Sequence, residues 1–168
     1  MDVFEEIYRQ YEADVRRFLY RLTGCDGRLT EELTQETFYQ AFLSFGSFRG
    51  TCQMRTWLCQ IAKHVYARYI RNETKQRRLA EQTVSAPEKT MQEHLEQKEL
   101  LLAVRSIIAQ MDEKTRTVTE YRLFSELSYA EIARLMHIRE STAMVICSRA
   151  KAKIRKRLKE EYGYEISV

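Results

Sequence analysis

Residues 48–78 read FRGTCQMRTWLCQIAKHVYARYIRNETKQRR, and this stretch decides how the rest of the chain is interpreted. From Met54 onward its apolar side chains recur at helical spacing: Met54, Trp57, Leu58, Ile61, Ala62, Val65 and Tyr69. This period predicts an amphipathic α-helix with one buried face. Along one side of this apolar face the residues are polar and mostly cationic: Gln60, His64, Arg68, Arg71, Lys75 and Arg78. Such a flank suits contact with an anionic polymer, and taken alone it fits the solvated side of a core helix equally well.

The composition favours an all-helical protein. The chain has 168 residues, of which 44% are apolar, enough for one ordinary domain or two small packed ones. It contains only five glycines and one proline, so few positions carry the turn chemistry that β-hairpins need. We therefore expect an all-α fold.

Charge is distributed in blocks along the chain. Residues 1–50 hold 6 basic and 9 acidic side chains, and residues 81–127 hold the same numbers. Residues 51–80 hold 7 basic and 1 acidic, and residues 128–168 hold 9 and 5. Two basic blocks separated by acidic ones predict two places where a polyanion binds, with acidic faces left for another partner.

Nothing in the sequence predicts catalysis, a metal site or a cofactor. The cysteines form no CxxC pair: Cys25, Cys52, Cys59 and Cys147. The histidines are far apart in sequence: His64, His94 and His137. There is no glycine-rich phosphate loop, no HExxH and no nucleophile elbow. We expect a protein that is not an enzyme, with free thiols.

The amino terminus, MDVFEEIYRQYE, lacks the basic flank and apolar run of a signal peptide. No window approaches 18 consecutive apolar residues. A soluble, cytoplasmic protein is the expectation.

A first helical module contains residues 48–78 together with the chain that precedes them. Apolar spacing predicts a helix over 3–22, ending near Gly24. Thr30, followed by two acidic residues, has the pattern of an N-cap, so a second helix is predicted from there to about Leu43. The helix predicted within residues 48–78 is expected to break or bend before Arg78.

A polar linker is predicted over residues 79–94, which have no sustained period and contain the sole proline, Pro87. It divides the chain into a first module at 1–78 and a second at 95–168. The second module is predicted to begin with helices over 95–111 and 113–124.

The last part of the chain has the pattern of a helix-turn-helix. Ser128 and Glu131 match the capping box S-x-x-E at the start of a short helix, and a turn near His137 leads into a longer one. Basic side chains crowd the longer helix: Arg149, Lys151, Lys153, Arg155, Lys156, Arg157 and Lys159. This density favours DNA binding over the alternative, a helical corner inside an ordinary bundle.

The two modules together resemble the extracytoplasmic-function sigma factors, bacterial subunits that direct RNA polymerase to promoters. The resemblance rests on DVRRFLYRLTG at 14–24, EELTQETFYQAF at 31–42, FRG at 48–50, RTWLCQIAKH at 55–64 and LSYAEIARLM at 127–136. It implies two small helical domains joined by a flexible linker: sigma region 2 at 1–78, the linker at 79–94 and sigma region 4 at 95–168.

The resemblance also implies three binding surfaces. Docking on the β′ clamp helices of core RNA polymerase would use Glu32, Gln35, Glu36, Phe38 and Phe42. Recognition and melting of the minus-ten element would use Trp57, Gln60, His64, Arg68, Arg71 and Lys75, with a core role for Trp57 as the alternative. Reading of the minus-thirty-five element, with this module on the β flap, would use Ser141, Thr142, Met144, Val145, Ser148, Arg149, Lys151 and Lys153.

Several positions depart from the family pattern. His64 stands where many members have Asn, and His137 stands where Gly usually forms the turn. Met144, Val145 and Ile146 replace more polar residues on the recognition helix. This apolar patch either reads thymine methyl groups or contacts a protein.

The family's usual partner is an anti-sigma factor, often membrane-bound, and we expect one here without insertion of this chain into the membrane. The alternative functions are a free-standing helix-turn-helix regulator and a helical scaffold.

Overall fold

The structure is a computed structural model that describes residues 2–80 and 95–165. Nearly all of the predicted linker, including Pro87 and His94, lies outside the described residues. The described part contains seven α-helices and one short 3₁₀ helix and no strand, which confirms the all-α prediction. In order they are α1 (Val3–Leu22), α2 (Gly27–Ser44), η1 (Phe45–Ser47), α3 (Met54–Leu79), α4 (Leu95–Ala109), α5 (Glu113–Phe124), α6 (Tyr129–Met136) and α7 (Glu140–Tyr162). No described helix is both long and apolar enough to cross a lipid bilayer.

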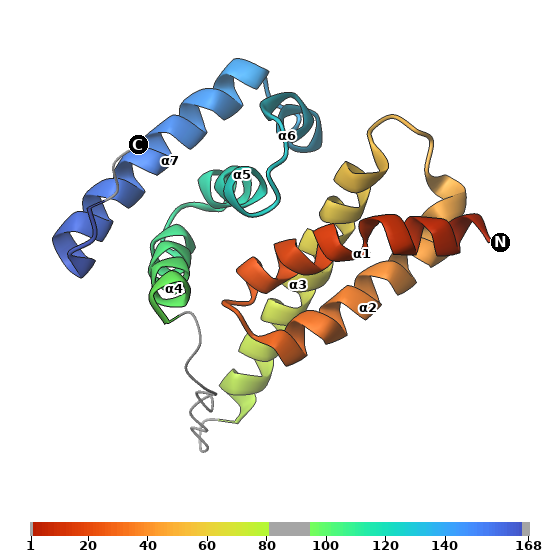
Figure 1. The fold of residues 1–168 in the computed structure, drawn as a ribbon, viewed down its shortest axis with the longest axis horizontal. Helices are drawn as coiled ribbons and strands as arrows, with labels where there is room; N and C mark the ends of the chain where they lie inside the picture. The colour runs from red at the N-terminus through yellow and green to blue at the C-terminus, as the bar shows by residue number, and fades with distance from the viewer. Residues whose placement is uncertain (1, 81–94, 166–168) are drawn as a thin grey trace.

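The first module is a bundle of α1, α2 and α3 (Figure 1). The predicted helix over 3–22 is confirmed, and the Asp2 side chain caps it by accepting from the Phe4 amide at 3.2 Å. Its buried face is Ile7, Val15, Phe18, Leu19 and Leu22.

Two predicted details of this module are wrong. The N-cap of α2 is Asp26 and not Thr30, because the Asp26 carboxylate accepts from the Leu29 amide and starts the helix four residues earlier. Thr30 is instead buried inside the helix, where its hydroxyl donates to the Asp26 carbonyl. A break or a bend was expected in the next helix, and the break is absent, since α3 runs without interruption for 26 residues.

The end of α1 brings the first module against the second. Gly24 has φ +71°, the left-handed conformation that glycine adopts at low cost just past a helix end. A Cβ added there would lie 3.1 Å from Leu102 of α4, so the position also requires the absence of a side chain.

The second module packs α7 against α4, α5 and α6. The helix predicted over 113–124 is confirmed as α5, and the capping box of Ser128 and Glu131 forms in both directions at the start of α6. His137 takes the left-handed turn conformation at φ 54°, and Arg139 precedes α7 without a side-chain cap bond. One face of α7 is buried against the module: Ala143, Cys147, Ala150, Ile154 and Leu158.

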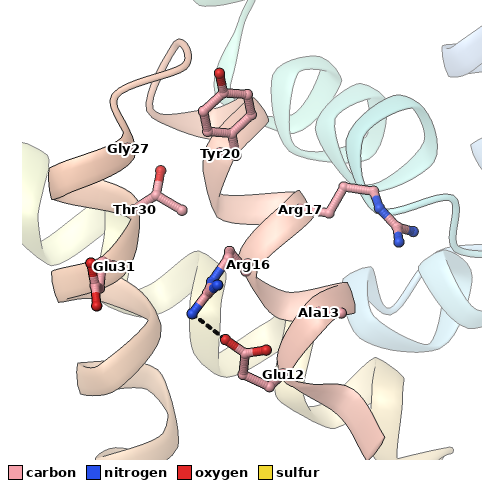
Figure 2. Close-up of a pocket in the computed structure, with 8 residues that line it drawn as sticks. All are labelled: Glu12, Ala13, Arg16, Arg17, Tyr20, Gly27, Thr30 and Glu31. Atoms are coloured by element: carbon pink, nitrogen blue, oxygen red, sulfur yellow. Dashed lines mark ion pairs between the residues drawn. The ribbon is translucent and has the colours of Figure 1, made fainter.

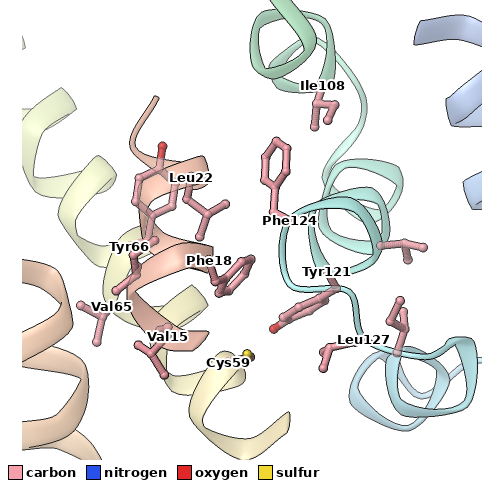
Figure 3. Packing of buried hydrophobic residues seen from close by; sticks show 14 of the residues in the cluster. Val15, Phe18, Leu22, Cys59, Val65, Tyr66, Ile108, Tyr121, Phe124 and Leu127 are labelled. Atoms are coloured by element: carbon pink, nitrogen blue, oxygen red, sulfur yellow. The ribbon is translucent and has the colours of Figure 1, made fainter. Parts of the chain in front are cut away.

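The two modules share one hydrophobic cluster (Figure 3). The Phe18 ring stacks on the Tyr121 ring with centroids 6.1 Å apart, and both side chains are buried. Burial raises the pKa of the Tyr121 phenol, so it stays neutral at the contact. We call this arrangement of the modules the closed arrangement.

Arginines from each module cap helix ends of the other. Arg105 of α4 donates from Nε to the carbonyl of Leu22, the last residue of α1, at 2.7 Å. In return, Arg21 donates to the carbonyl of Phe124, the last residue of α5, at 2.8 Å, and Arg55 donates to the carbonyl of Ser125. Carbonyls at a helix C-terminus lack intrahelical donors and carry partial negative charge, so cations suit them.

Candidate nucleic-acid interface

The α3 helix presents three faces, spaced about 120° apart at the 100° rotation per residue of an α-helix. The core face packs on α1 and α2 and consists of Leu58, Ala62 and Val65. The closure face meets the second module and consists of Thr56, Cys59, Lys63 and Tyr66. The DNA flank consists of Gln60, His64, Arg68, Arg71 and Lys75.

The DNA flank is open to solvent over most of its length. His64, Arg68, Arg71 and Lys75 are exposed and Gln60 is half-buried. A pocket of about 300 Å³ lies along this flank, with Ile61 and Val65 from α3 and Gln40 from α2 among its lining residues. The predicted residues His64, Arg68 and Arg71 complete the lining. The flank therefore offers cations around a recess that is lined by both polar and apolar side chains, a combination suited to a nucleotide strand.

Trp57 lies on the DNA-flank side of α3 and is half-buried. Its ring packs against Phe48, with centroids 4.9 Å apart, and against Phe45 at 6.5 Å. The indole thus anchors the loop before α3 while keeping part of its surface exposed. Its position is therefore compatible with both roles considered from the sequence, contact with the minus-ten element and packing in the core.

The predicted docking residues lie on α2, and the structure separates them into two groups. Glu32 and Gln35 are exposed, Glu36 is half-buried, and Phe42 is 56% exposed. Phe38 differs, because it is only 4% exposed and packs edge-on against Tyr8 with ring centroids 4.8 Å apart. Its side chain supports the helix in this conformation and is not presented to a partner.

Sequence reasoning missed two exposed apolar residues on the same helix. Tyr39 is 56% exposed and Leu43 is 60% exposed. With Glu32, Gln35 and Glu36 they form one row at helical spacing, which we call the docking row. The spacing of Tyr39 and Leu43 from Glu32 was the signal that could have found them.

The predicted recognition residues on α7 face away from the module core. Ser141, Met144, Val145, Ser148, Arg149 and Lys153 are exposed, whereas Thr142 and Lys151 are half-buried. Met144 and Val145 are adjacent in sequence and are 48% and 47% exposed, so together they place apolar area on the outer face of this helix. The helix therefore shows an apolar patch followed by cations.

A further pocket of about 430 Å³ lies between α1 and the start of α2 (Figure 2). Glu12 and Arg16 form an ion pair in its wall, and Tyr20, Thr30 and Glu31 also line it. Charges of both signs line this pocket, and it contains no residue of the DNA flank or the docking row. It has no predicted role.

Among the described residues no group of three or more His, Cys, Asp or Glu side chains could hold a metal ion. The four cysteines are free thiols. Burial raises the pKa of Cys59 to about 12, so this thiol stays protonated and unreactive on the closure face.

Comparison with known proteins identifies both modules. Residues 7–76 match the family model "Sigma-70 region 2" and residues 101–154 match "Sigma-70, region 4". RNA polymerase sigma factor YlaC of Bacillus subtilis is 28% identical over 165 residues, which cover 94% of this chain and 92% of the relative. ECF RNA polymerase sigma factor SigM of the same organism is 29% identical over 160 residues, which cover 95% of this chain and 94% of the relative.

Solved structures share the fold. The sigma factor RpoE in complex with the anti-sigma factor NepR, from Bartonella quintana, superposes with a TM-score of 0.68 at 18% identity, covering 94% of this chain and 98% of that one. CnrH in complex with the cytosolic domain of CnrY gives a TM-score of 0.65 at 18% identity, covering 94% and 88%.

Proposed function

The chain belongs to the family of ECF-type RNA polymerase sigma factors, and from this premise we propose how its surfaces direct polymerase to a promoter. As a member it is a transcription initiation factor, an alternative sigma factor. We propose region 2 at 1–78, a linker at 79–94 and region 4 at 95–168. Because its partner is RNA polymerase, we propose that it acts in the cytoplasm.

The docking row of α2 is the proposed contact with the β′ clamp helices of core polymerase. The exposed Glu32 and the half-buried Glu36 would meet a basic partner surface, and charge complementarity speeds such an encounter. The exposed ring of Tyr39 on the row and that of Phe42 beside it would supply apolar area to the contact, where aromatic side chains carry much of the binding energy.

The DNA flank of α3 is the proposed minus-ten surface. Opening DNA unstacks bases at a cost of a few kcal/mol for each extruded base. A cationic track that binds the displaced strand and a recess that takes an unstacked base offset this cost. Arg68, Arg71 and Lys75 would supply the track, and the pocket beside His64 the recess.

The exposed face of α7 is the proposed minus-thirty-five surface. Arg149 and Lys153 would contact phosphates, which position the helix without reading sequence. Met144 and Val145 would contact thymine methyl groups in the major groove.

The two surfaces must separate to serve one promoter. Elements about 25 base pairs apart are about 85 Å apart along the duplex, at 3.4 Å per base pair. A compact chain of this length is only about 40 Å across. We therefore infer that the closed arrangement opens before both elements are bound.

We propose an anti-sigma partner, tethered to the membrane, that covers the apolar patch at Met144 and Val145. The exposure of this patch supports the proposal, because exposed apolar area on a soluble module marks interaction sites. Size-exclusion chromatography with the cytoplasmic domain of the candidate encoded beside this chain should give a stable complex. Separate elution of the two proteins would contradict it.

The proposed function rests mainly on the row of exposed cations along α3. Run-off transcription tests this function. Core polymerase with this protein should initiate on a promoter that core alone ignores. Replacing Arg68 and Arg71 together by Ala should reduce open-complex formation, detected by permanganate reactivity, more than closed-complex binding. A matched pair on α1, Arg9→Ala with Arg16→Ala, should leave both unchanged. Tight binding of the protein alone to duplex DNA without initiation would favour a free-standing regulator.

A further inference from the structure

One carboxylate links the docking row to the DNA flank. Oε1 of Glu36 accepts a hydrogen bond from Nη2 of Arg68 at 3.2 Å and another from Nε2 of Gln40 at 2.8 Å. Glu36 belongs to the docking row, while Arg68 and Gln40 line the pocket beside the DNA flank. A single carboxylate oxygen therefore accepts hydrogen bonds from two of the residues that line the pocket.

From this geometry we propose that Glu36 restrains Arg68 and Gln40 in the free protein, and that docking on polymerase releases them for DNA. The inference rests on the proposed function, because it assumes that the docking row meets polymerase and that the flank meets the displaced strand. Its new content is that Glu36 is a positioning residue for the DNA surface, and that Gln40 belongs to that surface.

The chemistry favours competition for Glu36. An arginine paired with a carboxylate gives up donors and positive charge that a phosphate would otherwise use. A basic partner helix lying on the docking row would offer Glu36 other cations, because its neighbours Glu32, Gln35 and Tyr39 on that row are exposed. Once Glu36 pairs with the partner, Arg68 can bind a phosphate and the Gln40 amide can meet a base edge in the pocket.

The effect is reciprocal and modest in size. If docking favours DNA binding, then bound DNA favours docking by the same factor. Arg68 and Glu36 are 50% and 42% exposed, and exposed pairs of this kind are weak, so a change of about two- to five-fold is expected.

The test measures binding of a fluorescent single-stranded oligonucleotide carrying the non-template minus-ten sequence. Free wild-type protein is compared with Glu36→Gln and with Glu31→Gln, which removes an exposed charge from the same helix without touching Arg68. Glu36→Gln should bind about two- to five-fold more tightly and should raise the salt dependence toward one further phosphate contact. Glu31→Gln should match wild type.

A second background separates release of Arg68 from simple loss of negative charge. In Arg68→Ala protein, Glu36→Gln should give little further gain, because no arginine remains to be released. A gain of the same size in that background would overturn the inference, as would equal gains for Glu36→Gln and Glu31→Gln. Oligonucleotide binding by Glu36→Gln no tighter than by wild type, including no detectable binding by either, would also overturn it.

The same measurement with saturating core polymerase completes the design. The advantage of Glu36→Gln should disappear there, because docking has already released Arg68. Failure of the wild-type holoenzyme to open a promoter would contradict the proposed function, whereas an unchanged Glu36→Gln advantage in a working holoenzyme contradicts only this coupling.

Discussion

The core face and the closure face of α3 are both covered by protein, but different chemistry covers them. On the core face Leu58, Ala62 and Val65 meet apolar side chains of α1 and α2. On the closure face Lys63 meets Glu120 of α5, and Tyr66 accepts from Arg105 of α4. The first face holds a module together, and the second helps to hold two modules that we infer to separate at a promoter.

The difference has an energetic reason. Burial of apolar area stabilises by about 25 cal/mol per Å² and is lost when the face is exposed. A charge pair removed from water repays its desolvation only in part, so opening returns Lys63 and Glu120 to water at small net cost. The polar pairs of the closure face therefore oppose opening only weakly, whereas the buried Phe18–Tyr121 stack holds the two modules together by apolar burial. The contrast between the faces is measurable as the free energy of unfolding or of closure.

The largest effect is expected on the core face. Leu58 is fully buried, so Leu58→Ala should lower the free energy of unfolding by about 2 to 5 kcal/mol, measured by urea denaturation. Leu79 on the same helix is 80% exposed, and Leu79→Ala should change stability by no more than about 0.5 kcal/mol. Equal losses would show that the core face is not the support of the module.

The next effect is expected on the closure face. Lys63 and Glu120 are 13% and 10% exposed, so Glu120→Gln leaves a nearly buried ammonium without its counter-charge. Opening hydrates Lys63, and we expect the variant to shift toward the open state by about 1 to 3 kcal/mol, the cost of leaving a buried donor without its partner. Fluorescence energy transfer between labels on the two modules should report the separation.

A double variant controls that prediction. Lys63→Met with Glu120→Leu removes both charges and should stay closed, because apolar residues of similar volume can replace a buried pair without loss. A Glu120→Gln protein as compact as wild type would contradict the role given to the pair.

The sequence predicted those parts of the fold that local rules determine. The bounds of α5 and the capping box of α6 follow from residues within one helical turn, and both were confirmed. The start of α2 was missed because Asp26 and Thr30 both have cap-forming side chains, and only the structure shows which one accepts the amide hydrogen bond.

The closure face could not be read from periodicity. Thr56, Lys63 and Tyr66 look like a solvated side of a helix, since their partners Glu131, Glu120 and Arg105 lie 39 to 75 residues away in sequence. Phe38 shows why a single site residue could not be assigned from the sequence. The motif indicates that the helix docks on a partner, but Phe38 points inward because its ring packs against Tyr8 of another helix.

A smaller effect is expected from pH at the edge of the closure face. Partial burial works against ionisation of Glu131, but its hydrogen bonds from the Ser128 amide and the Thr56 hydroxyl outweigh it and lower the pKa of Glu131. A depressed carboxyl pKa contributes stability that is complete above the ordinary value of 4.5 and is lost as pH falls through the folded value. The stability difference between wild type and Glu131→Gln should therefore be largest at neutral pH and narrow below pH 4.5 in urea titrations. A difference that widens on acidification would contradict this sign.

The smallest effect on stability is expected for substitutions on the DNA flank, where the effect on DNA binding is expected to be large. Arg71 is exposed on α3, so Arg71→Ala should change the free energy of unfolding by no more than about 0.5 kcal/mol. The arginine is proposed to bind one phosphate, and its loss should reduce the slope of log K against log salt by about 1 for holoenzyme on promoter DNA. Arg9→Ala, on an exposed face of α1, should leave that slope unchanged. An unchanged slope for Arg71→Ala would remove this residue from the strand's path, and an equal change in both variants would show that total charge, and not the flank of α3, sets the salt dependence.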